Sequence, residues 1–262
     1  MIPISERKRI VVKVGTSTLT HRTGRLNIRR VEQLVKTLAD LQNAGHEMIL
    51  VSSGAIGLGM GKLGLMDRPK DTPGKQACAA VGQCELMYLY DNLFSEYSIT
   101  VAQLLLTKYI LLEDRRKNVE NALERLISQG VIPVVNENDT VAIDELELEM
   151  GENDSLAAVV ATIANADLLI IMSDIDGLYD SDPRQNPDAK MIPVVREISE
   201  DIHAVAGGAG TKFGTGGMAT KIHAVEIAYE SDIDVVLMNG QHPKKLYELF
   251  EDKPVGTLFH KG

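Results

Sequence analysis

The sequence contains no tryptophan, and aromatic residues make up only 4% of its 262 residues. Base-stacking platforms and aromatic cages are therefore poorly supported as functions. There are only two cysteines, Cys78 and Cys84, which lie six positions apart. They form neither a metal-ligand pattern nor a disulfide framework, and this indicates a reducing compartment.

Long hydrophobic runs are also missing. Residues 1–7 lack the apolar core of a signal peptide, and no stretch of 18 uncharged apolar residues occurs. Basic residues are in the minority, with 27 Lys and Arg against 37 Asp and Glu, which gives a formal net charge of −10. This balance argues against a nucleic-acid partner, because phosphate neutralisation requires clustered cations. A few local lysines can still bind a small anion. We expect a cytoplasmic protein with no membrane partner.

The chain is 44% hydrophobic, and strand-like and helix-like segments alternate along it. Short apolar runs predict strands at residues 10–14, 48–51, 99–106, 131–135, 168–172, 235–238 and 256–259. Apolar periodicity and capping residues predict helices at residues 28–44, 73–94, 114–129, 155–164, 218–230 and 244–250. Strands that are apolar on both faces imply an α/β fold with a mostly parallel sheet covered by helices on both sides. No repeat or linker is visible, so we expect one domain, 1–262.

Three segments interrupt this alternation. Residues 137–150 are acidic and could form a hairpin or flap, residues 174–190 are rich in Pro, Asp and Asn, and residues 206–217 carry six glycines. Loops of this kind in α/β proteins gather at the carboxyl ends of the strands, where ligands bind.

Lys13 lies inside an apolar predicted strand and is followed by small residues, Gly15 to Ser17. It either extends to water from an edge strand or pairs with an anion, because burying an unpaired ammonium group costs several kcal/mol. The second strand runs into the glycine-rich residues 52–61, which we interpret as a turn whose N–H groups hold an anion, or as a tight strand-to-helix connection. A G-x-G-x-x-G match at Gly59 begins too far beyond the strand for a dinucleotide fingerprint.

Two clusters of amides and acids occur at the ends of predicted elements, at residues 136–139 and 151–154. They could hold an ammonium group or a metal-bound phosphate. Asn and Asp also cap helices and form turns, which is the alternative for either cluster alone.

Residues 214–221 place three glycines at the start of a predicted helix and Lys221 one turn inside it. Free N–H groups and the helix dipole favour a bound phosphate there, although no P-loop motif occurs. The alternative is a loop before a capped helix. The pair Ser173 and Asp174, at the end of a predicted strand, could bind ribose or adenine edges, or form a turn.

Taken in order, these segments resemble the amino-acid kinase family. The matching segments are residues 12–17, 52–56, 136–139, 152–154, 180–183, 214–218 with Lys221, and 255–259. Each match is weak alone, but the ordered set is specific and spans residues 9–260. The resemblance implies a three-layer α/β/α sandwich with a mostly parallel central sheet. It also implies transfer of the γ-phosphoryl group of ATP, with Mg²⁺, to the side-chain carboxylate of L-glutamate, the first step of proline biosynthesis.

The resemblance implies a role for each matching residue. Lys13 and Lys221 would bind phosphate, and Asp154 would orient both lysines. Ser53, Asp139 and Asn153 would bind glutamate. The nucleotide-binding residues would be Lys13, Ser173, Asp174, Thr215, Gly216, Gly217, Met218, Ala219, Thr220 and Lys221. Proline would be a feedback inhibitor, and a homo-oligomer, dimer or tetramer, would use the helix at 73–94 as an interface.

Three features depart from the family pattern. The chain stops at Gly262, so we expect the short form without the C-terminal PUA domain of many members. Ser173 replaces the usual Thr, and Glu152 replaces the common Asp.

The open alternatives are a family member acting on acetylglutamate, aspartate, uridylate or carbamate, a catalytically silent sensor of an amino acid or nucleotide, and a dinucleotide-binding oxidoreductase. Retention of both lysines and Asp154 disfavours the sensor.

Overall fold

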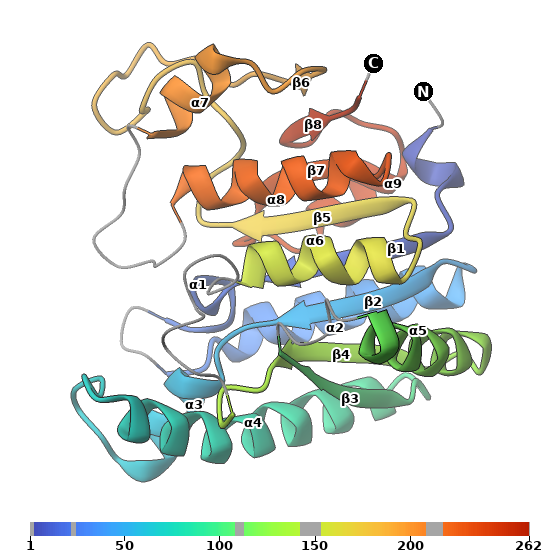
Figure 1. Ribbon diagram of the computed structural model, residues 1–262, viewed down its shortest axis with the longest axis vertical. Coiled ribbons are helices and arrows are strands. Elements are labelled where there is room, and N and C mark those ends of the chain that lie inside the picture. The colour runs from blue at the N-terminus through green and yellow to red at the C-terminus, as the bar shows by residue number, and fades with distance from the viewer. Residues whose placement is uncertain (1–2, 22–24, 108–112, 142–152, 208–216, 262) are drawn as a thin grey trace.

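The computed structural model describes residues 3–21, 25–107, 113–141, 153–207 and 217–261. A central sheet carries helices on both of its faces (Figure 1). The strands are β1 Arg9–Val14, β2 Glu47–Ser52, β3 Val101–Leu106, β4 Ile132–Glu137, β5 Leu168–Ser173, β6 Val194–Val195, β7 Asp234–Asn239 and β8 Thr257–Phe259. The helices are α1 Thr16–Leu19, α2 Ile28–Asn43, α3 Ala55–Leu63, α4 Thr72–Ser95, α5 Glu113–Ser128, α6 Asn153–Ile163, α7 Glu200–Gly207, α8 Met218–Glu230 and α9 Lys245–Phe250, with a 3-10 turn at Ile4–Glu6.

The strands are ordered β3-β4-β2-β1-β5-β7-β8-β6. The first six of these pair in parallel, β8 is antiparallel to β7, and β6 is parallel to β8. The chain starts at β1 in the middle, adds β2 on one side, and later adds β5 on the other. The carboxyl end of β1 is therefore a topological switch point, the place where open α/β sheets bind ligands. The predicted α/β fold with a mostly parallel sheet is confirmed.

Two hydrophobic cores lie on opposite faces of the sheet. Successive side chains of a strand point to opposite faces. In β1, Val11 packs in the core that contains α5, α6 and α8, whereas Val12 and Val14 pack in the core that contains α2, α4 and α9. By the same alternation, the side chain of Lys13 belongs to the face covered by α6 and α8.

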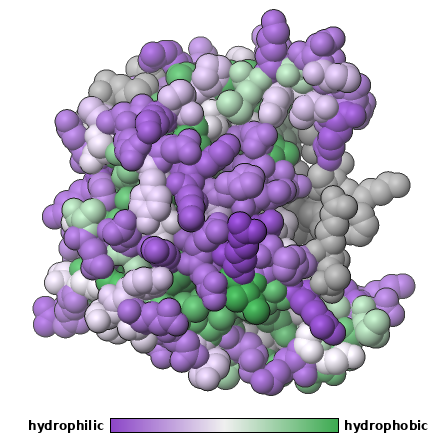
Figure 2. Space-filling view, turned by 180° about the vertical axis from the view of Figure 1, so that it is seen from behind, coloured by the Kyte–Doolittle hydropathy of each residue, from purple (hydrophilic) through white to green (hydrophobic). Residues whose placement is uncertain are grey.

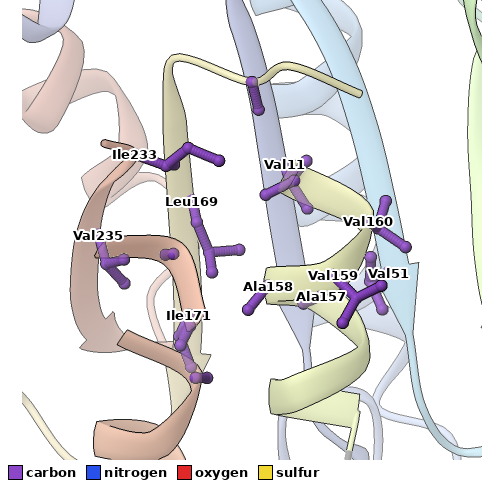
Figure 3. Packing of buried hydrophobic residues seen from close by; sticks show 14 of the residues in the cluster. Val11, Val51, Ala157, Ala158, Val159, Val160, Leu169, Ile171, Ile233 and Val235 are labelled. Carbon is purple, nitrogen blue, oxygen red and sulfur yellow. The ribbon is translucent and has the colours of Figure 1, made fainter. Parts of the chain in front are cut away.

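Helix α6 lies against the middle of the sheet through small side chains. Ala157 and Ala158 are fully buried in the core that also contains Val11 and Val51 (Figure 3). The first turn of α6 lies close to the carboxyl ends of β1 and β2, where Asn153 Nδ2 is 2.7 Å from Ser53 Oγ.

Only Ser53 and Gly54 separate β2 from α3, so most of the glycine-rich residues 52–61 are helical, while the binding of an anion by their N–H groups stays a prediction. Gly54 has φ +104°, a conformation that favours glycine, and α3 begins directly after it. Within α3, a Cβ atom on Gly59 would lie 1.8 Å from the carbonyl oxygen of Cys78, and on α4 a Cβ atom on Gly82 would lie 1.7 Å from that of Ala55. The glycines therefore let α3 and α4 pack in backbone contact, and a strand-to-helix connection is observed.

Every other predicted strand and helix occurs, with small shifts at the ends. Besides α3, three short elements, α1, α7 and β6, lie outside the predicted strands and helices, because each is too brief for a periodic pattern. Most of the acidic segment 137–150 and most of the glycine-rich segment 206–217 fall outside the described residues.

The face seen in Figure 2 is mostly hydrophilic, with hydrophobic residues gathered in its lower part. Large exposed hydrophobic side chains on α3, α4, β3 and the loop after α3 include Leu63, Leu65, Met66, Tyr88 and Leu105. The oligomer with an interface on α4 stays a prediction. In the ranges that the structure describes, every helix is too short or too polar to cross a membrane.

Candidate active site

Two lysines from distant parts of the chain meet on one buried carboxylate. The Nζ atom of Lys13 lies 2.6 Å from Oδ1 of Asp154, and Nζ of Lys221 donates a hydrogen bond to Oδ2 of the same carboxylate at 3.1 Å. All three residues are buried: Lys13 is 8% exposed, Asp154 1% and Lys221 6%. We call this cluster the charged triad.

The fold explains why these residues converge. Lys13 comes from β1 and shares its face with Val11, Asp154 lies in the first turn of α6, and Lys221 lies in the first turn of α8. Since α6 and α8 cover the same face of the sheet, all three side chains reach the switch point from one side. The predicted convergence of the two lysines is therefore present, while their chemical roles stay predictions.

The electrostatics of the triad favour an ionised carboxylate and an anionic ligand. Burial alone would raise the pKa of Asp154, but the charges of Lys13 and Lys221 together hold the pKa of this carboxyl below its ordinary value. Two ammonium groups and one carboxylate leave a formal charge of +1 in a nearly water-free place. Two ammonium groups held this close together favour an anionic ligand such as a phosphate group.

Next to the triad, four uncharged side chains form a continuous series of hydrogen bonds, which we call the amide chain. Asn153 Nδ2 donates to Ser53 Oγ at 2.7 Å and to Asn136 Oδ1 at 2.9 Å. Asn136 Nδ2 donates in turn to Gln83 Oε1 at 2.9 Å. The predicted substrate residues Ser53 and Asn153 are therefore in direct contact.

Asp139 lies in the turn that follows β4, at the same edge of the sheet as Asn136. Burial raises its pKa, and the charge of Arg68 offsets part of the effect. Asp139 forms no ion pair with another of the described residues, and such a carboxylate is suited to bind the cationic group of a ligand.

The predicted nucleotide residues lie at the ends of β5 and α8. Ser173 is buried, and its hydroxyl donates to Oδ1 of the exposed Asp174 at 3.1 Å. Gly217 precedes α8, Met218 begins it and is buried, Ala219 is exposed, and Thr220 Oγ1 donates to the Gly217 carbonyl at 2.8 Å. Thr215 and Gly216 lie outside the described residues.

Two residues of the amide chain were not among the predicted site residues. Asn136 belongs to a cluster that the sequence singles out, but of that cluster only Asp139 was assigned a role. One sequence feature could have indicated Gln83. It lies three and seven positions before the apolar Leu86 and Tyr90, so it shares the buried face of α4 with them. A buried amide needs hydrogen-bond partners, so this position indicates a polar site beneath the helix.

No group of three or more His, Cys, Asp or Glu side chains suited to a metal ion occurs among the residues that the structure describes. Both oxygens of Asp154 already contact ammonium groups. The described side chains therefore offer no preformed metal cage at this place.

The amino acid kinase family model matches residues 8–239. This match covers most of the chain, and the chain belongs to the amino acid kinase family.

Within that family, the chain is similar to proteins named glutamate 5-kinase. It is 51% identical to the one from Clostridium perfringens over 259 residues, which cover 98% of this chain and 96% of the relative. It is 48% identical over 262 residues to the one from Enterococcus faecalis, with 99% and 97% covered. It is 53% identical over 252 residues to the one from Caldanaerobacter subterraneus subsp. tengcongensis, with 96% of this chain and 67% of the relative covered.

Solved structures show the same fold at much lower identity. A carbamate kinase from Giardia lamblia bound to AMP-PNP gives a TM-score of 0.65 at 16% identity, with 99% of this chain and 100% of that chain covered. A UMP kinase from Bacillus anthracis gives a TM-score of 0.64 at 16% identity, with 97% and 96% covered. The fold is thus shared by kinases of different substrates, and the substrate has to be argued from the site.

Proposed function

We propose that the chain transfers the γ-phosphoryl group of ATP to the side-chain carboxylate of L-glutamate. The product is L-glutamyl 5-phosphate, and the reaction is the first step of proline biosynthesis. The observation that carries this proposal is the charged triad, in which two ammonium groups share one buried carboxylate at the switch point of the sheet.

The reaction needs charge neutralisation more than proton transfer. A glutamate side chain has a reference pKa of about 4.3, so the nucleophile is already ionised at neutral pH and needs no general base. A carboxylate oxygen forms the new bond to phosphorus, and the bond from phosphorus to the bridging oxygen breaks as ADP leaves with the electron pair. Two like unit charges about 4 Å apart repel by about 4 kcal/mol at an effective dielectric of about 20, so cations must surround the transferred group.

Lys13 and Lys221 are the cations that the chain supplies. Asp154 holds one ammonium group on each of its two oxygens, at 2.6 and 3.1 Å, and so fixes the separation and direction of both. Because the groups are held before the substrates arrive, little reorganisation is needed when charge develops in the transition state. Asp154 acts by positioning the lysines and contacts neither reacting oxygen.

Glutamate recognition is assigned to the amide chain and Asp139. Asn153 and Asp139 face the α-ammonium group, and Ser53 donates its hydroxyl proton to a carboxylate oxygen of glutamate. These assignments are supported by the contact between Ser53 and Asn153 and by the partial burial of Asp139, which raises the pKa of its carboxyl.

ATP is assigned to the side of the triad away from the amide chain. Ser173 and Asp174 at the end of β5 suit the ribose or adenine, and the first turn of α8 directs backbone N–H groups and Lys221 toward the phosphates. Mg²⁺ enters as part of the substrate, bound by phosphate oxygens and water as is usual for this ion, and it neutralises phosphate charge. Proline inhibits by competing with glutamate, and the protein works as a homo-oligomer.

Trapping of the product with hydroxylamine tests the proposal. An acyl phosphate formed from ATP and L-glutamate reacts with hydroxylamine to give a hydroxamate, and the purified chain should produce it only when both substrates are present. Parallel assays of ADP release with acetylglutamate, aspartate, uridylate and carbamate should give much lower rates. A faster reaction with one of these acceptors would overturn the assignment of glutamate, and binding without turnover would indicate a sensor.

A further inference from the structure

Gln83 is the buried end of the amide chain, and it lies on the face of the sheet opposite to α6. It lies on α4, is only 8% exposed, and accepts the hydrogen bond from Asn136 Nδ2 at 2.9 Å. Asn136 follows Val135 in β4, so its side chain points to the α4 side, whereas Asn153 belongs to α6 on the other side. Asn136 thus links the two faces across the carboxyl edge of the sheet.

The amide chain can run in two directions. In the observed direction, Gln83 presents its oxygen to Asn136, Asn136 presents its oxygen to Asn153, and Asn153 uses Nδ2 for both Asn136 and Ser53. Both protons of Asn153 Nδ2 are then engaged, and its Oδ1 is left as the group that can accept a proton from a ligand. Reversal of the chain would instead present an N–H group of Asn153 to the ligand.

We propose that Gln83 is a positioning residue that sets the direction of the amide chain, so that Asn153 presents its oxygen to the α-ammonium group of the substrate. This inference rests on the proposed function, since it takes glutamate as the acceptor. It adds a residue on α4 to the recognition of the amino group, and Gln83 acts through Asn136 and Asn153 without touching the substrate.

The packing of α4 fixes the position of Gln83. Its neighbour Gly82 contacts the backbone at Ala55, two residues beyond Ser53, so closely that a Cβ atom would lie 1.7 Å from the Ala55 carbonyl oxygen. One further contact, 2.8 Å between the hydroxyl oxygens of Tyr90 and Ser52, ties α4 to the end of β2. The two ends of the amide chain, Gln83 and Ser53, are therefore held by the same helix contact.

The second polar atom of Gln83 supports a functional role. Its Nε2 atom is buried without a hydrogen-bond partner among the described residues. An apolar side chain of the same shape would avoid this unfavourable group, and an unpaired buried donor in a native protein calls for a reason. The need for the oxygen of Gln83 at Asn136 supplies that reason.

The test compares two substitutions at one position. Gln83→Met keeps length and shape but removes the oxygen, and we expect the KM for glutamate to rise about tenfold while kcat and the KM for ATP change less than about twofold. Gln83→Glu keeps an acceptor at Asn136 and cannot reverse the chain through a donor, and we expect a KM for glutamate within about threefold of the wild type. Tyr90→Phe, which removes a buried contact of the same helix but none of the amide chain, is the matched control.

Three results would overturn the inference. They are an unchanged KM for glutamate in Gln83→Met, a rise of equal size in Gln83→Glu, and a rise of equal size in Tyr90→Phe, which would assign the effect to the docking of α4. If Gln83→Met does not fold, Gln83→Glu alone decides, because a large rise in its KM contradicts the direction of the chain. Wild-type hydroxamate formation is measured in parallel, and its absence would reject the proposed function instead of the role of Gln83.

Discussion

The charged triad and the amide chain lie at the same edge of the sheet, but they solve opposite problems. The triad holds three formal charges at exposures of 8% or less and keeps an excess of +1. The amide chain holds no charge and is ordered only by the direction of its hydrogen bonds. Strong charge stabilises a highly charged transition state, whereas neutral directional groups distinguish one small substrate from another.

Mutations in the two clusters should therefore have different effects. Removing one member of the triad changes the number of unpaired buried charges, which affects both stability and turnover. Removing one member of the amide chain changes which atom faces the substrate, which affects substrate affinity most. This division would be contradicted if mutations in the triad and in the amide chain changed stability, turnover and substrate affinity in the same way.

The largest effect is expected for Asp154→Asn. The substitution removes the carboxylate that both ammonium groups contact, so the formal charge of the triad rises from +1 to +2. Breaking a buried ion pair in this way costs about 3–5 kcal/mol of unfolding free energy, and we expect kcat to fall by about 10³-fold or more. Urea unfolding and steady-state kinetics measure the two quantities.

Asp232→Asn is a matched control for this substitution. Its carboxylate pairs with Lys261 at 3.0 Å but is 83% exposed, and its φ of 54° suits asparagine. We expect no measurable loss of stability or activity. A fully active Asp154→Asn variant would show that the lysines do not need the carboxylate between them.

The next effect in size is expected for Lys221→Met. The variant keeps the ion pair of Lys13 and Asp154, so the fold should lose much less stability than in Asp154→Asn. One cation is missing in the transition state, and we expect kcat to fall by about 10²–10³-fold with a much smaller change in the KM for glutamate. Near-normal turnover would remove Lys221 from the mechanism, and Lys253→Met, which alters an exposed lysine, serves as the control.

Much of the fold could be predicted from the sequence because its strongest signals are local. Asn27 caps α2 as its position predicts, accepting a hydrogen bond from the N–H of Arg30 at 3.2 Å. Buried strands such as β5 are continuous apolar runs, which is the pattern of a parallel sheet. The helix α3 was missed because its glycines serve contact with α4, a tertiary reason that propensity does not contain.

The site divides in the same way. Lys13 was conspicuous as a charge in an apolar strand, and Lys221 as a charge beside glycines at a helix start. Gln83 was missed because a single polar residue on a helix carries no information about which strand it faces. Its contact with Asn136 depends on the pairing of β4 with β2 and on the close packing of α3 and α4, and both are three-dimensional facts.

A smaller effect, confined to affinity, is expected for Asp139→Asn. The substitution keeps the shape and removes the charge that, in the proposed function, faces the α-ammonium group, and a hydrogen bond to a charged group contributes about 1.5–3 kcal/mol. We expect the KM for glutamate to rise about 10- to 100-fold with the KM for ATP unchanged. A change in the KM for ATP instead would mean that the two substrate sites are exchanged.

The smallest effect is a pH dependence that separates the two acids without mutation. Because the pKa of Asp139 is raised, this carboxyl takes up a proton at a higher pH than an ordinary aspartate, and the α-ammonium group then loses its counterion. Because the pKa of Asp154 is lowered, its carboxylate stays ionised over the same range. As pH falls from about 7 toward the raised pKa of Asp139, the KM for glutamate should increase while kcat stays nearly constant. In Asp139→Asn this increase should disappear, and a parallel fall in kcat in the wild type would instead place the titrating group in the triad.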